Sequence, residues 1–541
     1  MTKFSQMEYK RPDFNALFDE GKALLGRMEK AGSAQELFDA MQALDNEMRH
    51  LATQRTLAHI RYTINTKDEF YDKENDTFDE ELPRFQEIST EAARIVLESP
   101  YKDDVAQKYG PHLLEKYEVQ RKVFKPEIVE DLVEENKLSS EYQKLMASAE
   151  IEFDGKKHNL SGLIPYMEST DRGVRRAANA ASWGWIASHQ QELDELYDKL
   201  VKVRHRIGQK LGYENFIPVA YARMGRTDWD QEDAKRYRDQ IVESVVPLTG
   251  KLYREQAQRI GISDMKNYDY SLMFLSGNPT PKGEEAYMVE QAKVMYKELS
   301  PETDAFFSIM TGQELMDLTT KPGKANGGYM TFIDDYKVPF IFSNFNGTSG
   351  DVDVLTHEAG HAFQGWLQRD VELKDIAEIT SEVAEIHSMS MEFFTHPWME
   401  RFFKEDTEKY FYSHVVDALS FLPYGASIDE LQEWVYEHPD ATPEQRRAQY
   451  REIEKKYLPH LDYDGLEFLE KGGRWQKQLH VYLYPFYYLD YTLSQICALQ
   501  YFTWDMKDHD AAWQSYLTLC KLSGRVPFKK LVPQSGMKSP F

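Results

Sequence analysis

The chain has 541 residues, and its 90 acidic against 65 basic side chains give a formal charge of −25. A hydrophobic content of 41% is enough for a large globular interior, and chains of this length usually divide into subdomains. The acidic excess argues against nucleic acid as a partner, because a phosphate backbone needs a basic surface. We expect most of the charge to be solvated helix surface.

The sequence shows no sign of a membrane or export segment. No run approaches the ~18 apolar residues of a spanning helix, and the mean hydropathy is −0.63. The first residues, MTKFSQMEYKRPDFNALF, lack the apolar core and cleavage site of a secretory signal. Cys497 and Cys520 are too few for a disulfide scaffold, and we expect buried thiols. These features predict a cytoplasmic protein without a membrane partner.

Helical patterns fill most of the chain. Between residues 15 and 64, apolar side chains recur every three or four positions, and similar patterns cover residues 86–150 and most of 165–260. Residues 151–160, IEFDGKKHNL, place an Asp-Gly pair between short alternating stretches and predict a β-hairpin. We take this hairpin as the boundary between an N-terminal helical lobe, residues 1–150, and a second lobe, residues 151–541.

A second β region is predicted over residues 327–347, GGYMTFIDDYKVPFIFSNFNG. Its alternation and aromatic content indicate two short antiparallel strands, and Pro339 suits an edge strand. The predicted fold class is therefore mainly α with a small antiparallel sheet.

The segment DVDVLTHEAGHAFQGWLQ, residues 351–368, contains two histidines four positions apart. On a helix, His357 and His361 project from one face and can bind one Zn²⁺. Glu358 follows the first histidine, which places its carboxylate beside the metal, where it can take a proton from a water on that metal.

The surroundings of this motif strengthen the zinc interpretation. The pattern arises by chance in roughly one chain per hundred of this size. Here a β segment ends at Gly347, a turn follows, and an apolar helix starts that Ser349 or Asp351 could cap. Gly360 leaves room for a close approach on the side of the metal.

A catalytic zinc needs a third protein ligand, and we expect it from residues 375–394, DIAEITSEVAEIHSMSMEFF. Five side chains of this segment follow one another at helical spacing: Glu378, Glu382, Glu385, Met389 and Glu392. The spacing alone does not choose between Glu382 and Glu385. An acid that does not bind the metal could accept a hydrogen bond from a ligand imidazole and fix its tautomer.

The tyrosine-rich segment QLHVYLYPFYYLDYTLSQ covers residues 478–495. Four of its residues would share one face if the whole segment were helical: His480, Tyr484, Tyr488 and Tyr491. Pro485 fits best as the first helical residue, which leaves His480 and Tyr484 on the approach. Such a stripe is more often core packing, but a Tyr hydroxyl with a pKa of ~10 could also stabilise the oxyanion of peptide hydrolysis.

Three pieces in this order resemble the thimet oligopeptidase and oligoendopeptidase F family of zinc metallopeptidases: HEAGH (357–361), ITSEVAEIHSMSMEFF (379–394) and the tyrosine-rich segment. ESTDRGVRRAANAASW (168–183) is also similar to oligoendopeptidase F sequences. The similarity covers at least residues 150–541 and is closest to bacterial oligoendopeptidase F and Pz-peptidase-like enzymes.

The resemblance implies that Glu385 is the third ligand of one zinc ion. It implies a mainly α, two-lobed ellipsoid in which the zinc lies deep in a channel, so that only short, unstructured peptides reach it. It also implies that His480, Tyr484 and Tyr491 contact the substrate or stabilise the tetrahedral intermediate, with Tyr488 nearby.

We therefore expect a zinc endopeptidase that hydrolyses short oligopeptides, with Glu358 as the general base. An extended peptide could add to the edge of the strand at residues 340–347, with Phe342 and Asn344 as candidate substrate contacts. Two alternatives stay open. One is a zinc carboxypeptidase or dipeptidyl carboxypeptidase, in which Arg525 could bind the free carboxylate; the other is a catalytically silent peptide-binding protein.

Overall fold

The computed structural model describes residues 2–541 and is mainly α, with 71% of residues in helices. Its strands form two small sheets. The predicted fold class is confirmed. The first six α-helices are α1 (Phe14–Glu29), α2 (Ala34–Ile64), α3 (Glu69–Glu98), α4 (Lys102–Tyr109), α5 (Pro111–Gln120) and α6 (Val129–Ala147).

Eight helices follow between the hairpin and the second sheet: α7 (Ile164–Met167), α8 (Arg172–Ser188), α9 (Gln190–Leu211), α10 (Ile217–Arg223), α11 (Gln231–Gln240), α12 (Val246–Ile260), α13 (Glu285–Leu299) and α14 (Pro301–Gly312). The remaining helices are α15 (Gly350–Leu367), α16 (Lys374–Ala377), α17 (Ser381–Phe394), α18 (Glu400–Phe403), α19 (Thr407–Glu437), α20 (Pro443–Tyr457), α21 (Glu467–Glu470), α22 (Leu479–Leu483), α23 (Tyr487–Asp505), α24 (His509–Leu522) and α25 (Phe528–Gln534).

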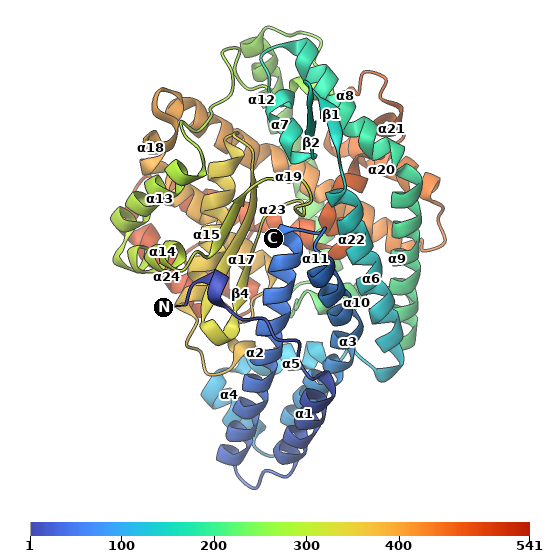
Figure 1. The fold of residues 1–541 in the computed structure, drawn as a ribbon, viewed down its shortest axis with the longest axis vertical. Helices are drawn as coiled ribbons and strands as arrows, with labels where there is room; N and C mark the ends of the chain where they lie inside the picture. The colour runs from blue at the N-terminus through green and yellow to red at the C-terminus, as the bar shows by residue number, and fades with distance from the viewer. Residues whose placement is uncertain (1) are drawn as a thin grey trace.

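The N-terminal helices form the narrow end of an elongated molecule (Figure 1). Their apolar faces build a core of their own, in which α1 packs against α2 and α3. A larger core holds the remaining elements together and includes side chains of α6, which packs on α9. The predicted lobe boundary at residue 150 stays a prediction.

Two half-open cavities lie where the N-terminal helices meet the rest of the protein. A cavity of about 580 Å³ is lined by α3, α5 and α6 on one side and by the segments 222–228, 378–383 and 524–528 on the other. A smaller cavity of about 130 Å³ shares Leu483 with it and reaches Tyr484. Neither cavity is lined by His357, His361 or Glu385, so the predicted channel to the metal stays a prediction.

The Asp-Gly hairpin forms as predicted, with β1 (Ile151–Phe153) antiparallel to β2 (Lys156–His158). Asp154 and Gly155 both have positive φ angles, of 49° and 73°. This backbone is the tight two-residue turn for which Asp-Gly is favoured.

The second sheet contains one strand more than predicted. β4 (Tyr329–Ile333) and β5 (Val338–Phe345) are antiparallel, as expected, but β3 (Met316–Thr319) pairs with β5 in parallel. The strand order β3-β5-β4 makes β5 central. The edge-strand prediction for Pro339 is therefore wrong. The proline is tolerated because β3 pairs with β5 only from Ile341 onward, so that Pro339 has a partner on one side only.

The order of the strands also changes where a peptide could bind. Both sides of β5 are paired in its central part, so the predicted addition of a peptide to residues 340–347 is wrong. The sheet has two edge strands, β3 and β4, and β4 directly follows Gly327 and Gly328.

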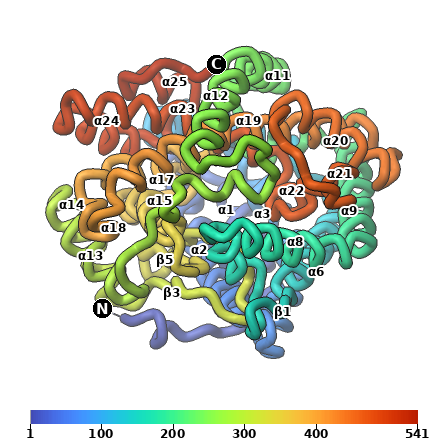
Figure 2. Tube along the Cα trace, turned by 90° about the horizontal axis from the view of Figure 1, so that it is seen from above, coloured from blue at the N-terminus to red at the C-terminus, as the bar shows by residue number. Residues whose placement is uncertain are grey.

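Helix α15 lies between this sheet and α17 (Figure 1, Figure 2). The contact with α17 is close because Gly360 has no side chain. A Cβ atom at this position would lie 2.6 Å from the carbonyl oxygen of His387 and 2.7 Å from Cα of Ser388. Both atoms belong to the backbone of α17, which cannot move away as a flexible side chain could.

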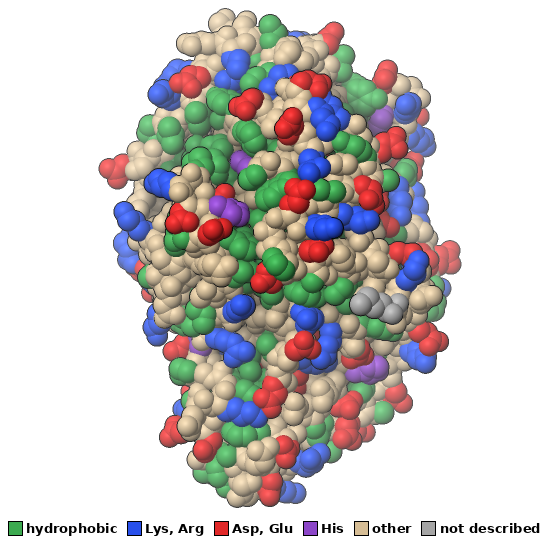
Figure 3. All heavy atoms as spheres, turned by 90° about the vertical axis from the view of Figure 1, so that its left-hand side faces the viewer, with side chains coloured by type: hydrophobic (Ala, Val, Ile, Leu, Met, Phe, Trp, Pro, Cys, Tyr) green, Lys and Arg blue, Asp and Glu red, His purple; other side chains and the backbone are tan. Residues whose placement is uncertain are grey.

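The surface does not gather positive charge on the face shown in Figure 3, where acidic and basic side chains are interspersed. Within residues 2–541, none of the helices is both long and apolar enough to cross a lipid bilayer.

Gly360→Ala tests the close contact of α15 with α17. The added methyl group would overlap the backbone of His387 and Ser388, and overpacking of this kind typically lowers the free energy of unfolding by about 1–3 kcal/mol. Gly184→Ala on α8, where no atom lies within 4 Å of the added carbon, is the matched control and should be neutral or stabilising. Chemical denaturation measures both variants. Wild-type stability of Gly360→Ala would contradict the close packing.

Candidate active site

Helix α15 carries the HExxH residues and begins at Gly350, shortly after strand β5. Ser349 is its N-cap residue, but the serine side chain makes no capping hydrogen bond. The Asp351 carboxylate instead accepts the backbone N–H groups of Asn346 and Gly347, both at 2.8 Å. Asp351 therefore fixes the turn between strand and helix, and the side-chain cap proposed from the sequence is not formed.

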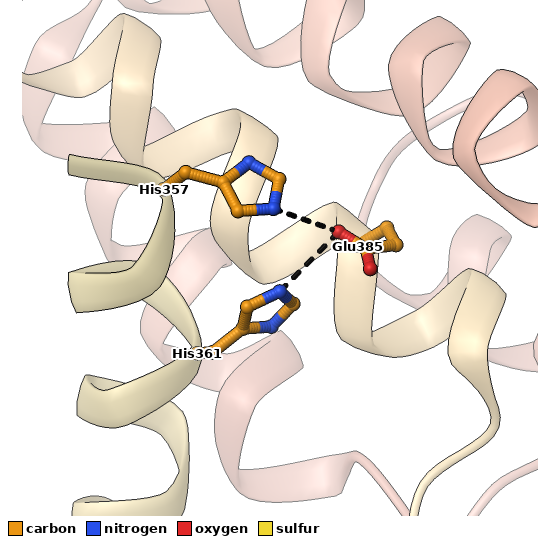
Figure 4. A group of neighbouring side chains, drawn as sticks. All are labelled: His357, His361 and Glu385. Atoms are coloured by element: carbon orange, nitrogen blue, oxygen red, sulfur yellow. Dashed lines mark ion pairs between the residues drawn. The ribbon is translucent and has the colours of Figure 1, made fainter. Parts of the chain in front are cut away.

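Two histidines of α15 and one glutamate of α17 point toward a common centre (Figure 4). His357 Nε2 lies 3.1 Å and His361 Nε2 3.3 Å from Glu385 Oε2. The glutamate side chain is almost fully buried, whereas both rings remain partly accessible. The three residues that the resemblance implies as metal ligands are thus brought together by two helices.

The geometry fits a tetrahedral zinc ion. Bonds of about 2.0–2.1 Å at tetrahedral angles separate neighbouring ligand atoms by about 3.3 Å, which matches the two N–O distances. Burial alone would raise the pKa of the Glu385 carboxyl, but the rings of His361 and His357 hold it well below its usual range. Two imidazoles and one charged carboxylate are a typical donor set for catalytic zinc, which keeps a fourth position open.

Glu392 lies behind the first histidine. Its Oε1 atom is 2.6 Å from His357 Nδ1. We assign the ring proton to Nδ1 from this contact, which leaves the lone pair of Nε2 directed at the metal position. Glu392 is one turn from Met389 and two turns from Glu385 on the same helix. The helical spacing predicted that these residues share one face, and both acids of this face contact His357.

The other two acids of the predicted line lie elsewhere. Glu382 is buried and accepts the indole N–H of Trp229 at 2.9 Å. Glu378 is not part of α17, since it caps the preceding helix α16. The structure therefore favours Glu385 over Glu382 as the third ligand, a choice that the spacing left open.

The carboxylate of Glu358 is poised next to this centre. Only 6% of the residue is exposed, and its Oε2 atom has no hydrogen-bond partner within the protein. Burial raises its pKa, and the nearby negative charges of Glu385 and Glu392 act in the same direction. A Cβ atom on Gly328 would lie 3.4 Å from Glu358 Oε1, so the start of β4 runs directly past this carboxylate.

The tyrosine-rich segment is broken at Pro485 into two helices. His480 lies in the short α22, and α23 begins at Tyr487. Phe486 between them has a φ of +69°, a left-handed conformation that is rare for a bulky residue. The break was predicted, but Pro485 precedes the N-cap of α23 and is not its first residue.

Two tyrosines of α23 reach the candidate centre. Tyr487 donates its hydroxyl to Glu385 Oε1 at 2.7 Å, and the hydroxyl of Tyr491 lies 3.2 Å from Nε2 of His480. Tyr487 was not among the residues predicted for the site. The signal was its spacing of four from Tyr491, which places both rings on one face once α23 is known to start after Pro485.

The other two tyrosines lie farther out. Tyr488 is 8% exposed and donates to Gln478 Oε1 at 2.6 Å, so its hydroxyl is engaged within the protein. Tyr484 is 51% exposed at the edge of the smaller cavity. Its ring centre is 6.1 Å from that of His480, which leaves it near the site but outside its hydrogen bonds.

Phe342 is fully buried and its ring stacks on Tyr329, so it has no surface for a substrate. The direct contact predicted for Phe342 is therefore corrected to packing. Asn344 is partly buried, and its amide donates to the carbonyl groups of Ala325 and Gly327, both at 2.8 Å. Asn344 thus anchors the loop before β4, and its contact with a substrate stays a prediction.

A buried arginine holds the break between α22 and α23. Arg226 donates to the carbonyl oxygen of Phe486 and to Asp490 Oδ1, both at 2.8 Å. Its guanidinium group lies 4.3 and 4.0 Å from the ring centres of Tyr221 and Trp229, which contact each other edge-on. These contacts fix the unusual conformation that sets His480 opposite Tyr491.

The comparison with protein families decides the classification. The model described as "Peptidase family M3" matches residues 165–519, and "Peptidase M3 N-terminal domain" matches residues 4–124. The chain belongs to peptidase family M3. It is a metalloendopeptidase, in agreement with the expectation from its motifs.

Individual relatives agree with this assignment. Oligopeptidase PepF of Bacillus subtilis (strain 168) is 22% identical over 550 residues, which cover 94% of this chain and 79% of the relative. A solved structure of Pz peptidase A with an inhibitor is 48% identical, with a TM-score of 0.99 over 99% of this chain and 96% of the other. A crystal structure of an oligoendopeptidase F candidate is 49% identical, with a TM-score of 0.99 over 100% and 96% of the two chains.

Glu385→Gln and Glu382→Gln distinguish the two candidate third ligands. We expect Glu385→Gln to weaken metal binding at least about tenfold, because a neutral amide replaces the only charged donor. Glu382→Gln should retain the metal, since Glu382 contacts Trp229 instead. The metal content after dialysis against a defined zinc buffer gives the answer, and the reverse pattern would refute the assignment to Glu385.

Arg226→Met tests how the break at Phe486 is held. It leaves Asp490 as a buried acid without its cation, and we expect a loss of about 3–5 kcal/mol in the free energy of unfolding. Arg226→Met/Asp490→Leu removes both charges and should recover much of this stability. The double variant still lacks the bond to the Phe486 carbonyl, so its kcat should stay reduced. Full activity of the double variant would contradict the positioning role of Arg226.

Proposed function

We propose that the protein is a zinc-dependent endopeptidase that cleaves short oligopeptides. One observation carries this proposal, namely the convergence of His357, His361 and Glu385 beside the partnerless carboxylate of Glu358. These three side chains would hold the zinc ion through two imidazole nitrogens and one carboxylate oxygen. When bound, zinc supplies Lewis-acid chemistry, which lowers the pKa of water and polarises the scissile carbonyl group.

Glu358 is the proposed general base. Its burial beside Glu385 and Glu392 raises its proton affinity, which suits a carboxylate that must take a proton from the attacking water. The same carboxyl then passes the proton to the amine that leaves. Its position next to Gly328 brings it close to any peptide that follows β4.

Tyr491 and His480 are the proposed donors to the developing oxyanion. Burial, with the nearby charge of Glu385, holds the pKa of Tyr491 well above its usual range, so its hydroxyl stays protonated. Burial lowers the pKa of His480 to about 4, so the ring is neutral at physiological pH. The Tyr487 hydroxyl is already bonded to Glu385 and orients that carboxylate. We keep Tyr484, which is exposed near His480, and Tyr488 as proposed substrate contacts.

The free edge of β4 is the proposed docking site for the peptide backbone. Main-chain hydrogen bonds of this kind do not depend on side chains, which supports broad sequence tolerance. The half-open cavities next to α22, which lie between the N-terminal helices and the larger part, support a limit to short and unstructured substrates. Equal rates for octamers and for chains much longer than ~20 residues would count against this closed arrangement.

The zinc carboxypeptidase or dipeptidyl carboxypeptidase that the sequence left open is not the reaction that the family comparison supports. It requires a cation for the free carboxylate of its substrate, and Arg525 was the residue considered for this role. Arg525 is exposed and follows Gly524, which packs against the carbonyl groups of Ile376 and Glu378. Cleavage of a peptide blocked at both ends separates the two reactions, because an exopeptidase would leave that peptide intact.

Glu358→Gln tests the assigned base. We expect kcat to fall by about 10²–10⁴, the usual contribution of a general base, while zinc content stays at the wild-type value. The assay uses a doubly blocked fluorogenic octapeptide, with chelation and zinc re-addition as the control for metal dependence. A variant with unchanged turnover would refute the role of Glu358, and a wild type that stays inactive after zinc re-addition would refute the zinc proposal. Unchanged turnover of the wild type after chelation would show that catalysis needs no metal and would also refute the zinc proposal.

A further inference from the structure

A chain of buried polar contacts continues outward from the candidate metal centre. Glu392 accepts from His357 Nδ1 with Oε1 and faces His414 Nε2 with Oε2, at 2.6 and 2.7 Å. His414 Nδ1 in turn lies 2.8 Å from His396 Nε2. These hydrogen bonds thus join α15, α17, α19 and the 3₁₀ turn at His396–Trp398.

The two outer histidines are buried among aromatic rings, and the carboxylates of Asp353 and Asp417 also lie near His414. His414 is 7% exposed and His396 is 8% exposed. The ring of Tyr410 stacks on His414 with an angle of 8° between the planes, and Phe393 covers it at 4.7 Å between ring centres. Burying an imidazole ring among aromatic side chains costs free energy unless its nitrogens are hydrogen-bonded. The hydrogen bonds of His414 and His396 are therefore needed for the burial of these rings.

The chemistry of the three side chains decides which atoms donate in these hydrogen bonds. A carboxylate only accepts, so both His357 Nδ1 and His414 Nε2 must donate to Glu392. Burial lowers the pKa of His396 to about 2, so that ring is neutral. A neutral His396 can donate to His414 Nδ1 or accept from it, which lets it hold the outer ring in either charge state of His414.

We propose that His414, held by His396, is a positioning residue that fixes Glu392 and thereby keeps His357 in the tautomer and orientation that bind the metal. The inference rests on the proposed function, since it concerns the affinity of the same metal centre. Without the His414 donor, Glu392 Oε2 would be a buried carboxylate oxygen that has lost its ion-pair partner. The carboxylate would then turn or take up a proton, and the His357 ring would lose its fixed acceptor.

Zinc competition with a chromophoric chelator, on metal-free protein, tests this proposal without any activity measurement. His414→Met removes the donor and should weaken zinc binding by about 10–100-fold, the usual effect of losing a partner behind a ligand histidine. His414→Gln places an amide N–H near the position of Nε2 and should restore binding toward the wild-type value. His396→Leu acts only through His414 and should give a smaller loss than His414→Met.

His509→Met is the matched control. It removes an imidazole–carboxylate contact of similar length, 2.6 Å to Asp505, at a partly exposed position on the neighbouring helix α24 and outside this set of hydrogen bonds. Thermal unfolding of each metal-free variant reports whether its fold is intact. The same zinc affinity in His414→Met and wild type, or an equal loss in His414→Gln and His414→Met, would overturn the proposal. A wild-type protein that binds no zinc would instead refute the proposed function, so the two failures are distinguishable.

Discussion

The absence of a side chain at Gly360 sets the distance between the two helices that carry all three proposed metal ligands. α15 supplies His357 and His361, and α17 supplies Glu385, so the ligand set exists only where these helices touch. The backbone of α17 fills the space in which a Cβ of Gly360 would lie. Because helices are stiff and their contact is close-packed, the ligand atoms are placed by the fold before any metal arrives.

This placement concentrates negative charge. Glu358, Glu385 and Glu392 lie within one buried region, where the charges of Glu385 and Glu392 disfavour the ionisation of Glu358. The rings of His357 and His361 act in the opposite direction on Glu358 and Glu385. A divalent cation bound between these groups would offset more of the negative charge. The excess of buried negative charge at this site therefore favours the uptake of a cation.

The sequence predicted the parts of the site that depend on local spacing. His357, Glu358 and His361 follow from a helical repeat of four, and the mainly α fold follows from the same periodicity. β3 was missed because four residues, MDLT, carry too little pattern to indicate a strand, and its parallel partner lies 25 positions away. Phe342 was misassigned for a related reason, since only the position of β5 between two neighbours shows that its side chain is internal.

Choices between neighbouring residues needed tertiary contacts. Glu382 and Glu385 differ by less than one helical turn, and the indole of Trp229, more than 150 positions earlier, is what engages Glu382. Tyr487 and Tyr488 are adjacent, and the partner of each, Glu385 or Gln478, is set by how α23 leaves the break at Phe486. Periodicity defines a face of about a hundred degrees, and the packing of other elements selects within it.

The two halves of the proposed chemistry are supported by different buried groups. The metal ligands depend on the packing of α15 on α17 and on the acid behind His357, whereas the oxyanion donors depend on the break that Arg226 holds against Phe486 and Asp490. Glu385 is the link between them, because Tyr487 of α23 donates to the same carboxylate that faces the histidines. A shift of α23 would therefore displace the Glu385 carboxylate through its hydrogen bond with Tyr487. A shift of α15 that moves Glu385 would displace Tyr487 through the same hydrogen bond. Glu385 is thus both a proposed metal ligand and the residue through which the two supports contact each other.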